Sequence, residues 1–141
     1  MEIYGLGKQA ALVRLASEGM ETHRIAKSAE AIWDEVDSAL SPIIGSRGVS
    51  ALFRRSVHLL RADYSWLQSA YDGRLDDELF VVLRTALSQQ LPSTAAAANG
   101  ALLQAFYHLL ANLIGGSLTT RLLRSALENP SSESVAQEIK Q

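Results

Sequence analysis

The residues from 46 to 63 combine side chains that bind anions with one that can accept a proton or a phosphoryl group. This stretch, SRGVSALFRRSVHLLRAD, contains four arginines and one histidine. The arginine guanidinium is a planar fork of N–H donors that fits carboxylates and phosphates. Histidine changes charge near neutral pH and acts as an acid, a base or a nucleophile. The stretch therefore indicates recognition of an anionic group, with phosphoryl transfer as a second chemistry.

A helical projection separates the apolar side chains of this stretch from the basic ones. At about 100° per residue, one side collects a core stripe of Val49, Leu52, Phe53, Ser56, Val57 and Leu60. The opposite side centres on His58, with four arginines around it: Arg47, Arg54, Arg55 and Arg61. No aspartate or glutamate lies between residues 47 and 61 to neutralise them. We therefore predict a helix over about residues 49–63 with a basic side that faces solvent.

The run from His58 to Ala62 resembles the histidine motif of histidine-containing phosphotransfer (HPt) domains. In that motif, the histidine is followed by lysine three residues later and by glycine four residues later. Arg61 and Ala62 stand at those positions, so the chain departs from the motif in both identities. The resemblance covers five residues. It implies a helical bundle in which His58 accepts phosphate from receiver domains and Arg61 meets the phosphoryl oxygens.

The segment from 40 to 60 is similar to small helical bacterial proteins of uncharacterised function that are associated with signal-transduction genes. The similarity lies in SPIIG at 41–45 and RGV at 47–49. Arginine also outnumbers lysine ten to three, which is typical of GC-rich bacterial genomes. These observations favour a bacterial protein with a role in signalling.

We interpret the basic side of the predicted helix as a docking surface for a protein partner that presents carboxylates, such as a receiver domain or a histidine kinase. The predicted docking residues are Arg47, Arg54, Arg55, His58 and Arg61. Two alternatives stay open: an ordinary solvated helix surface, and histidine phosphotransfer through His58. A third is a small-molecule sensor whose pocket inside the bundle is lined by Trp33, Phe53, Trp66 and Phe106.

Binding to nucleic acid is not expected. The run Gly48-Val49-Ser50 is similar to the turn of a helix-turn-helix motif. However, Arg54 stands where that motif needs an apolar residue to pack the recognition helix. The formal net charge of −2 provides no general attraction to a polyanion.

A second candidate site is an uncharged stripe on the predicted helix that ends at Ile114. Gln104, His108 and Asn112 are spaced by four residues and therefore lie on one side, among alanines and glycine. Small residues allow another helix to approach closely, either from the same chain or from a second copy in a homodimer. The alternative is an exposed side rich in alanine. We expect no metal at His108, because no second histidine or carboxylate lies at ligand spacing.

The chain contains no phosphate-binding glycine loop, metalloprotease motif or nucleophile elbow. Acidic residues gather at 34–37, where the helical projection turns them to solvent, and at 76–78, where Asp76 suits a helix N-cap. The absence of cysteine excludes disulfides and thiolate metal sites. We therefore expect a non-catalytic protein with no metal and no cofactor.

Helical periodicity recurs along the chain, and no strand pattern is sustained. Helices are expected at about 8–17, 22–39, 49–63, 76–90, 93–114 and 118–128, with a loop at 64–74. The second should bury a stripe of Ile25, Ala29, Ile32, Trp33, Val36 and Leu40. The predicted fold class is an all-α bundle of five to six helices. It forms a single domain over 1–128, followed by a flexible C-terminal tail at 129–141.

Length and hydropathy agree with one ordinary globular domain, since the chain has 141 residues of which 48% are apolar. No segment reaches the ~18 consecutive apolar residues that a membrane span needs. The N-terminal residues lack the basic start and apolar run of a signal peptide. We therefore expect a cytoplasmic protein that does not act on membranes.

Overall fold

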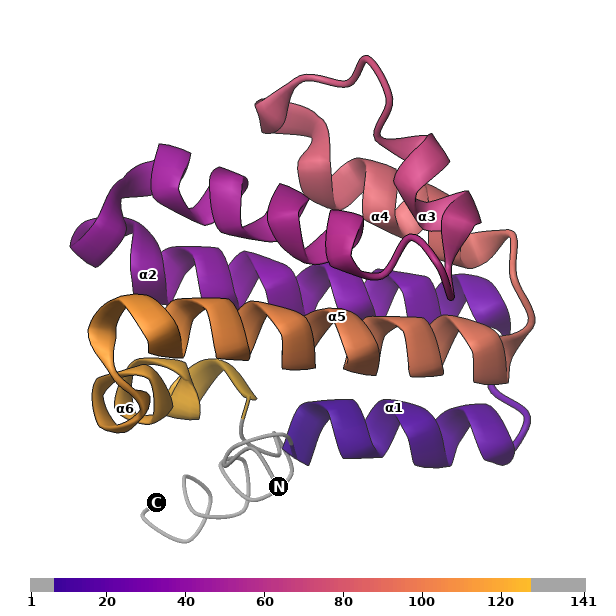
Figure 1. Ribbon diagram of the computed structural model, residues 1–141. Helices are drawn as coiled ribbons and strands as arrows, with labels where there is room; N and C mark the ends of the chain where they lie inside the picture. The colour runs from indigo at the N-terminus through magenta and orange to yellow at the C-terminus, as the bar shows by residue number, and fades with distance from the viewer. Residues whose placement is uncertain (1–6, 128–141) are drawn as a thin grey trace, which may run out of the picture.

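The computed structural model describes residues 7–127 and shows a helical bundle (Figure 1). Its elements are α1 (Gly7–Ser17), α2 (Thr22–Leu59), α3 (Ser65–Ala70), the 3-10 turn η1 (Asp76–Glu78), α4 (Leu79–Ser88), α5 (Pro92–Ile114) and α6 (Gly116–Leu127). No strand occurs within the described residues. The predicted all-α bundle is confirmed. The predicted C-terminal tail at 129–141 lies outside the described part of the chain.

The long element α2 consists of two arms that meet at Gly45. Gly45 has φ 82° and ψ 155°, which is not helical. Only glycine adopts this backbone conformation readily, because it has no Cβ. Figure 1 shows the chain reversing here, so that the C-terminal arm (residues 46–59) runs back along the N-terminal arm (residues 22–44). The two helices predicted in this region correspond to these two arms.

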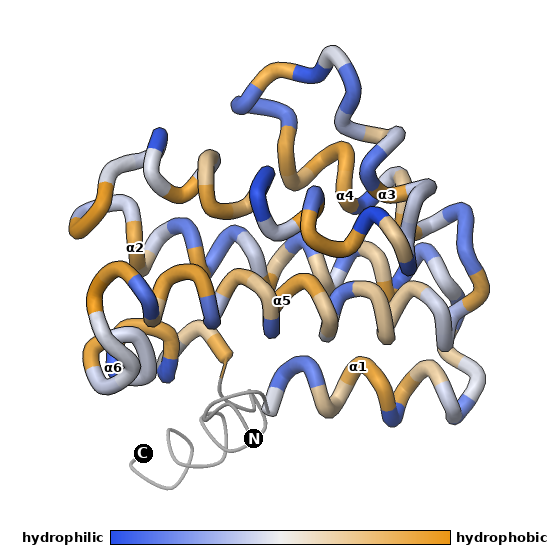
Figure 2. The backbone as a smooth tube through the Cα atoms, in the orientation of Figure 1, coloured by the Kyte–Doolittle hydropathy of each residue, from blue (hydrophilic) through white to orange (hydrophobic). Residues whose placement is uncertain are grey.

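The core lies between α2, α4, α5 and α6. The apolar stripe predicted for the N-terminal arm is buried at all six positions. At its centre, the Trp33 ring contacts Phe53 edge-on, with centroids 4.9 Å apart, and Phe106 at 5.2 Å. Figure 2 shows how hydrophobic positions alternate with hydrophilic ones along these helices. Trp33, Phe53 and Phe106 therefore fill the core, and only Trp66 of the aromatic set predicted to line a ligand pocket stands at the surface, half-buried.

A buried chain of hydrogen bonds fastens α1 to the bundle. The Trp33 indole N–H donates to Asn99 Oδ1 at 2.8 Å, and Asn99 Nδ2 donates to Gln9 Oε1 at 2.8 Å. Gln9 Nε2 in turn donates to the Ala96 carbonyl at 2.7 Å. A Cβ at Gly100 would lie 2.8 Å from Gln9 Nε2, so glycine permits this close contact between α1 and α5. These hydrogen bonds join α1, α2 and α5, and no local pattern in the sequence predicts them.

Three local predictions between residues 59 and 79 are wrong. The helix predicted to reach residue 63 ends at Leu59, because the next N–H groups bond to carbonyls three residues back and tighten the turn. The predicted loop contains α3, whose six residues are too few to give a periodic signal. Asp76 is not a helix N-cap: it begins the short 3-10 turn η1, and its carboxylate bonds to Arg54.

Candidate functional site

The C-terminal arm of α2 separates apolar from basic side chains as the helical projection predicted. Val49, Phe53 and Val57 are at most 2% exposed and pack into the core. The opposite side of the arm faces solvent, and His58 is exposed there. The arm is held against the bundle by its buried side, which fixes the direction in which the basic side chains leave the surface.

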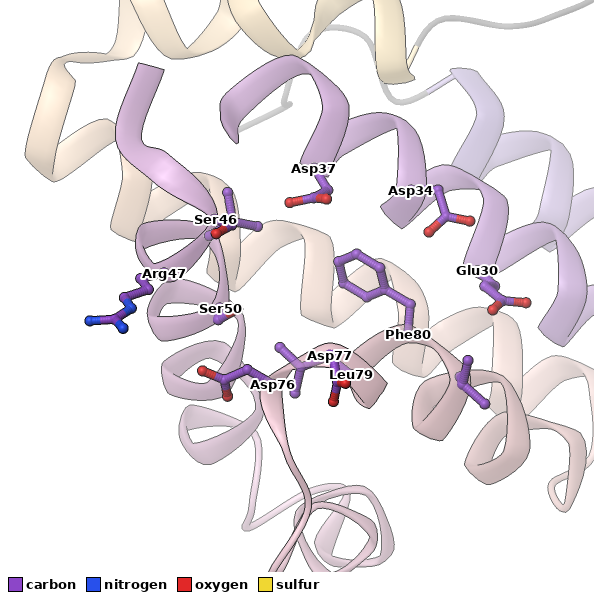
Figure 3. Close-up of a pocket in the computed structure, with 12 residues that line it drawn as sticks. Glu30, Asp34, Asp37, Ser46, Arg47, Ser50, Asp76, Asp77, Leu79 and Phe80 are labelled. Carbon is purple, nitrogen blue, oxygen red and sulfur yellow. The ribbon is translucent and has the colours of Figure 1, made fainter. Parts of the chain in front are cut away.

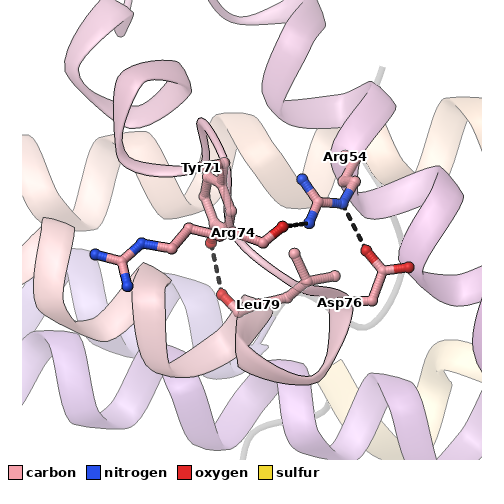
Figure 4. Close-up of polar contacts among 5 residues, drawn as sticks. All are labelled: Arg54, Tyr71, Arg74, Asp76 and Leu79. Carbon is pink, nitrogen blue, oxygen red and sulfur yellow. Dashed lines mark hydrogen bonds and ion pairs between the residues drawn. The ribbon is translucent and has the colours of Figure 1, made fainter.

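Arg54 does not belong to the free basic surface. Its Nε donates to Asp76 Oδ1 at 2.7 Å, and its Nη2 donates to the Arg74 carbonyl at 2.5 Å (Figure 4). The guanidinium thus holds the segment that connects α3 to α4. The expectation that no carboxylate neutralises the arginines is wrong at this position, because Asp76 reaches Arg54 from 22 residues further along the chain.

The connecting segment is also fixed from its other side by Tyr71. The Tyr71 hydroxyl donates to the Leu79 carbonyl at 2.7 Å (Figure 4). Burial raises the pKa of this hydroxyl well above its usual value, and the nearby Arg54 guanidinium opposes part of the shift. Tyr71 and Arg54 are therefore parts of the scaffold that position η1 and the start of α4.

Four of the five predicted docking residues remain exposed on the arm and its end: Arg47, Arg55, His58 and Arg61, hereafter the basic face. None of them forms an ion pair with another residue between 7 and 127. Arg61 Nη1 donates to the His58 carbonyl at 2.9 Å, which ties its guanidinium to the end of the helix. The three arginines of the basic face thus carry charges that no carboxylate of the described fold compensates.

The surroundings of His58 differ from those that the HPt resemblance implies. Because α2 ends at Leu59, Arg61 and Ala62 lie beyond the end of the helix. They follow in a tightened turn, and Arg61 folds back onto the His58 carbonyl. His58 is accessible to a partner. Arg61 and Ala62, which correspond to the lysine and glycine of the motif, follow it in a turn and not in a continuous helix.

An acidic hollow of about 530 Å³ lies beside the basic face, between the two arms of α2 and the start of α4 (Figure 3). Its five carboxylates come from two distant segments: Glu30, Asp34, Asp37, Asp76 and Asp77. Phe80 stands between these two groups in Figure 3, and Arg47 lies at the rim with its guanidinium directed away from the hollow. The two acidic groups are far apart in the sequence, and no local pattern shows that the fold brings them together.

The charges in the acidic hollow are partly compensated. Arg84 Nη1 lies 3.2 Å from Glu30 Oε1, and Asp76 is paired with Arg54. Burial raises the pKa of Asp34, and the neighbouring Glu30 and Asp37 carboxylates raise it further. The hollow therefore keeps a net negative potential next to the positive one of the basic face.

The uncharged stripe on α5 is present at the surface. Gln104 Nε2 and His108 Nε2 are 3.1 Å apart, and both His108 and Asn112 are exposed. This confirms that the three polar residues line up along one side of α5. Gly100, at the start of the stripe, packs against Gln9 of α1, while His108 and Asn112 stay uncovered within residues 7–127. The predicted role of the stripe as an interface between two copies stays a prediction.

The described residues contain no group of three or more histidine, aspartate or glutamate side chains arranged to hold a metal ion. No helix among them is long and apolar enough to cross a membrane.

The fold and the site together define an all-α protein that carries adjacent basic and acidic surfaces. No family model matches the chain, and neither a curated protein nor a solved structure matches it. The resemblance to HPt domains thus rests on the residues around His58 alone.

Proposed function

We propose that this protein is a non-catalytic adaptor that docks a protein partner through the basic face. The observation that carries the proposal is the contrast in charge compensation along the C-terminal arm. The Arg54 guanidinium donates its hydrogen bonds to groups within the fold. The other three arginines form no ion pair with a carboxylate of the described residues: Arg47, Arg55 and Arg61. Exposed arginines on and just beyond a helix that packs against the core favour a partner that supplies carboxylates in return.

The acidic hollow restricts how such a partner is oriented. A partner surface that places carboxylates on the basic face must avoid placing them over Asp34 and Asp77, since like charges in contact oppose binding. The partner surface that fits best is acidic where it meets the arm and neutral or basic where it meets the hollow. A bacterial receiver domain or histidine kinase, with carboxylates around its phosphorylation site, is the signalling partner we propose.

Capture of partners from a lysate of the native cells tests this function. The test variant Arg55→Glu/Arg61→Glu reverses the charge of the basic face and leaves Arg54 in place. The matched control, Arg121→Glu/Arg124→Glu, makes the same change in net charge at two exposed arginines of α6. We expect the wild type and the control to retain the same acidic protein and the test variant to lose it. Equal capture by all three proteins would contradict the proposal.

Phosphotransfer through His58 is the alternative function, supported by the exposure of this side chain on the basic face. It is tested with phosphoramidate, which donates its phosphoryl group to an imidazole nitrogen and releases ammonia. If His58 is the acceptor, the wild type and His108→Gln become phosphorylated and His58→Gln does not. If His58→Gln still binds the captured partner and no phosphohistidine forms, the adaptor function stands and the relay function fails.

A further inference from the structure

A groove with an apolar floor runs between α1 and the N-terminal arm of α2. Its volume is about 260 Å³. The apolar side chains that line it are Ala11, Leu12, Leu15, Ala31 and Ile32. Lys8 and Glu35, which form an ion pair, line it as well and close one end. Leu12 and Ile32 are only 3% and 4% exposed, so they form a floor, and the alanines leave the space above it open.

The other end of the groove is cationic. It continues into a second hollow of about 360 Å³ that shares Ser28 and Ala31 with the first and is lined by Arg24 and Lys27. Both of these basic side chains are exposed, and neither forms an ion pair with a residue of the described chain. Glu21, the acidic residue nearest to Arg24 in sequence, lies 3.6 Å from His23, and Glu30, the nearest to Lys27, pairs with Arg84. The two hollows, hereafter the channel, thus adjoin at Ser28 and Ala31. The first has an apolar floor and ends at the ion pair between Lys8 and Glu35, and the second is lined by basic side chains.

We infer that this channel binds a linear amphiphile with one saturated chain and an anionic head group. The chain would lie over Leu12 and Ile32, and the carboxylate or phosphate would meet Arg24 and Lys27 through charge-assisted hydrogen bonds. The distance along α2 from Arg24 to Glu35 is about 16 Å at the helical rise, which is close to the length of a dodecyl chain.

The closed end of the groove favours an alkyl chain over a partner helix. The ion pair between Lys8 and Glu35 would obstruct a helix that continues past the groove, whereas a chain terminus can stop there.

Calorimetric titration of the full chain with laurate, kept below its micelle concentration, tests the inference. Dodecyltrimethylammonium carries the same chain on a cationic head, and hexanoate carries the same head on a short chain. We expect laurate to bind at one site at least about tenfold more tightly than either, as the loss of one charged hydrogen bond or of several buried methylenes requires. Equal binding of laurate and dodecyltrimethylammonium, or no binding of laurate, would overturn the inference.

Two variants locate the site. Ala31→Trp fills the channel from an exposed helical position that lines both hollows, and it should abolish laurate binding. The matched control, Ala10→Trp, places the same side chain on the exposed side of α1 and should bind laurate like the wild type. Arg24→Glu/Lys27→Glu should weaken laurate binding by about tenfold and favour the cationic amphiphile instead. Unchanged binding by Ala31→Trp would overturn the assignment of the site.

A second experiment distinguishes a free fatty acid from a membrane lipid as the source of the anionic chain. Sedimentation with phosphatidylglycerol vesicles is compared with binding of free laurate. Laurate binding without vesicle binding assigns a free fatty acid, and binding to both, sensitive to Ala31→Trp in each case, assigns a lipid chain. Binding of neither probe would overturn the inference and leave the groove to a protein segment.

Discussion

Arg54 and Arg55 are neighbours in the chain and have the same side chain, but they face different environments. Arg54 donates to Asp76 and to the Arg74 carbonyl and is part of the scaffold. Arg55 points away from the bundle and has no ion-pair partner within residues 7–127. The same contrast separates the buried chain Trp33–Asn99–Gln9 from the exposed polar stripe on α5. Polar groups that are satisfied within the fold support stability, and those that are left at the surface are available for binding.

The largest effect is expected from a substitution within the buried hydrogen bonds that join Trp33, Asn99 and Gln9. Asn99→Ala removes two hydrogen bonds and leaves the Trp33 N–H and a Gln9 oxygen buried without partners. We expect a loss of about 3 kcal/mol in the free energy of unfolding, because each orphaned buried group costs roughly 1–3 kcal/mol. Urea denaturation measures this. Asn112→Ala on the exposed side of the same helix is the control and should change stability by less than ~0.5 kcal/mol. Equal effects would contradict the role of the buried chain.

A smaller effect is expected from the arginine pair itself. Arg54→Ala should cost about 1 kcal/mol, because a partly exposed ion pair contributes less than a buried one and the lost carbonyl bond adds to it. Arg55→Ala should stay within ~0.5 kcal/mol of the wild type. Hydrogen exchange adds a local readout, since amides between residues 72 and 78 should exchange faster in Arg54→Ala and not in Arg55→Ala. If both variants lose the same stability, the division of roles is wrong.

The smallest expected effect concerns Asp34 in the acidic hollow. Its pKa is raised by folding, so the native state binds this proton more tightly than the unfolded state does, and the contribution of Asp34 to stability falls as pH rises. Asp34→Asn should therefore be more stable than the wild type at pH 7. The gain in the free energy of unfolding should be roughly a few tenths of a kcal/mol, because the site is largely exposed. The gain should vanish below the ordinary aspartate pKa of 3.8.

Thermal denaturation at pH 3, 5 and 7 checks the prediction for Asp34. Asp63→Asn, which replaces an exposed aspartate outside the hollow, is the control and should show no such gain. A gain for Asp34→Asn that grows as pH falls would have the wrong sign and would show that the carboxylates of the hollow do not repel one another.

The sequence predicted the features that depend on local periodicity. The buried stripe of the N-terminal arm and the core side of the C-terminal arm follow from a spacing of three and four residues, and both are observed. The exposure of Arg55, His58 and Arg61 follows from the same projection. The helix end at Leu59 was not predicted, because no glycine or proline marks it in the sequence. The tightened turn depends instead on hydrogen bonds formed by Arg61 and by the backbone after Leu59.

The features that the sequence did not predict join segments far apart in the chain. Arg54 and Asp76 are separated by 22 residues, and Asn99 lies 90 residues from Gln9. The acidic hollow and the groove along α1 likewise depend on how helices pack, which no local pattern specifies. The alanine that opens the groove, Ala31, is indistinguishable in sequence from any other helix-forming alanine.

Photo-crosslinking in the native cells tests the central claim most directly. A crosslinking side chain at Ala51, an exposed position of the C-terminal arm, is compared with one at Ala97 on the exposed side of α5. We expect one crosslinked protein with an acidic surface at Ala51. It should be absent at Ala97, and it should be lost from Ala51 when Arg55→Glu/Arg61→Glu is added. The same crosslinked proteins at both positions, or a crosslink at Ala51 that survives the charge reversal, would contradict it.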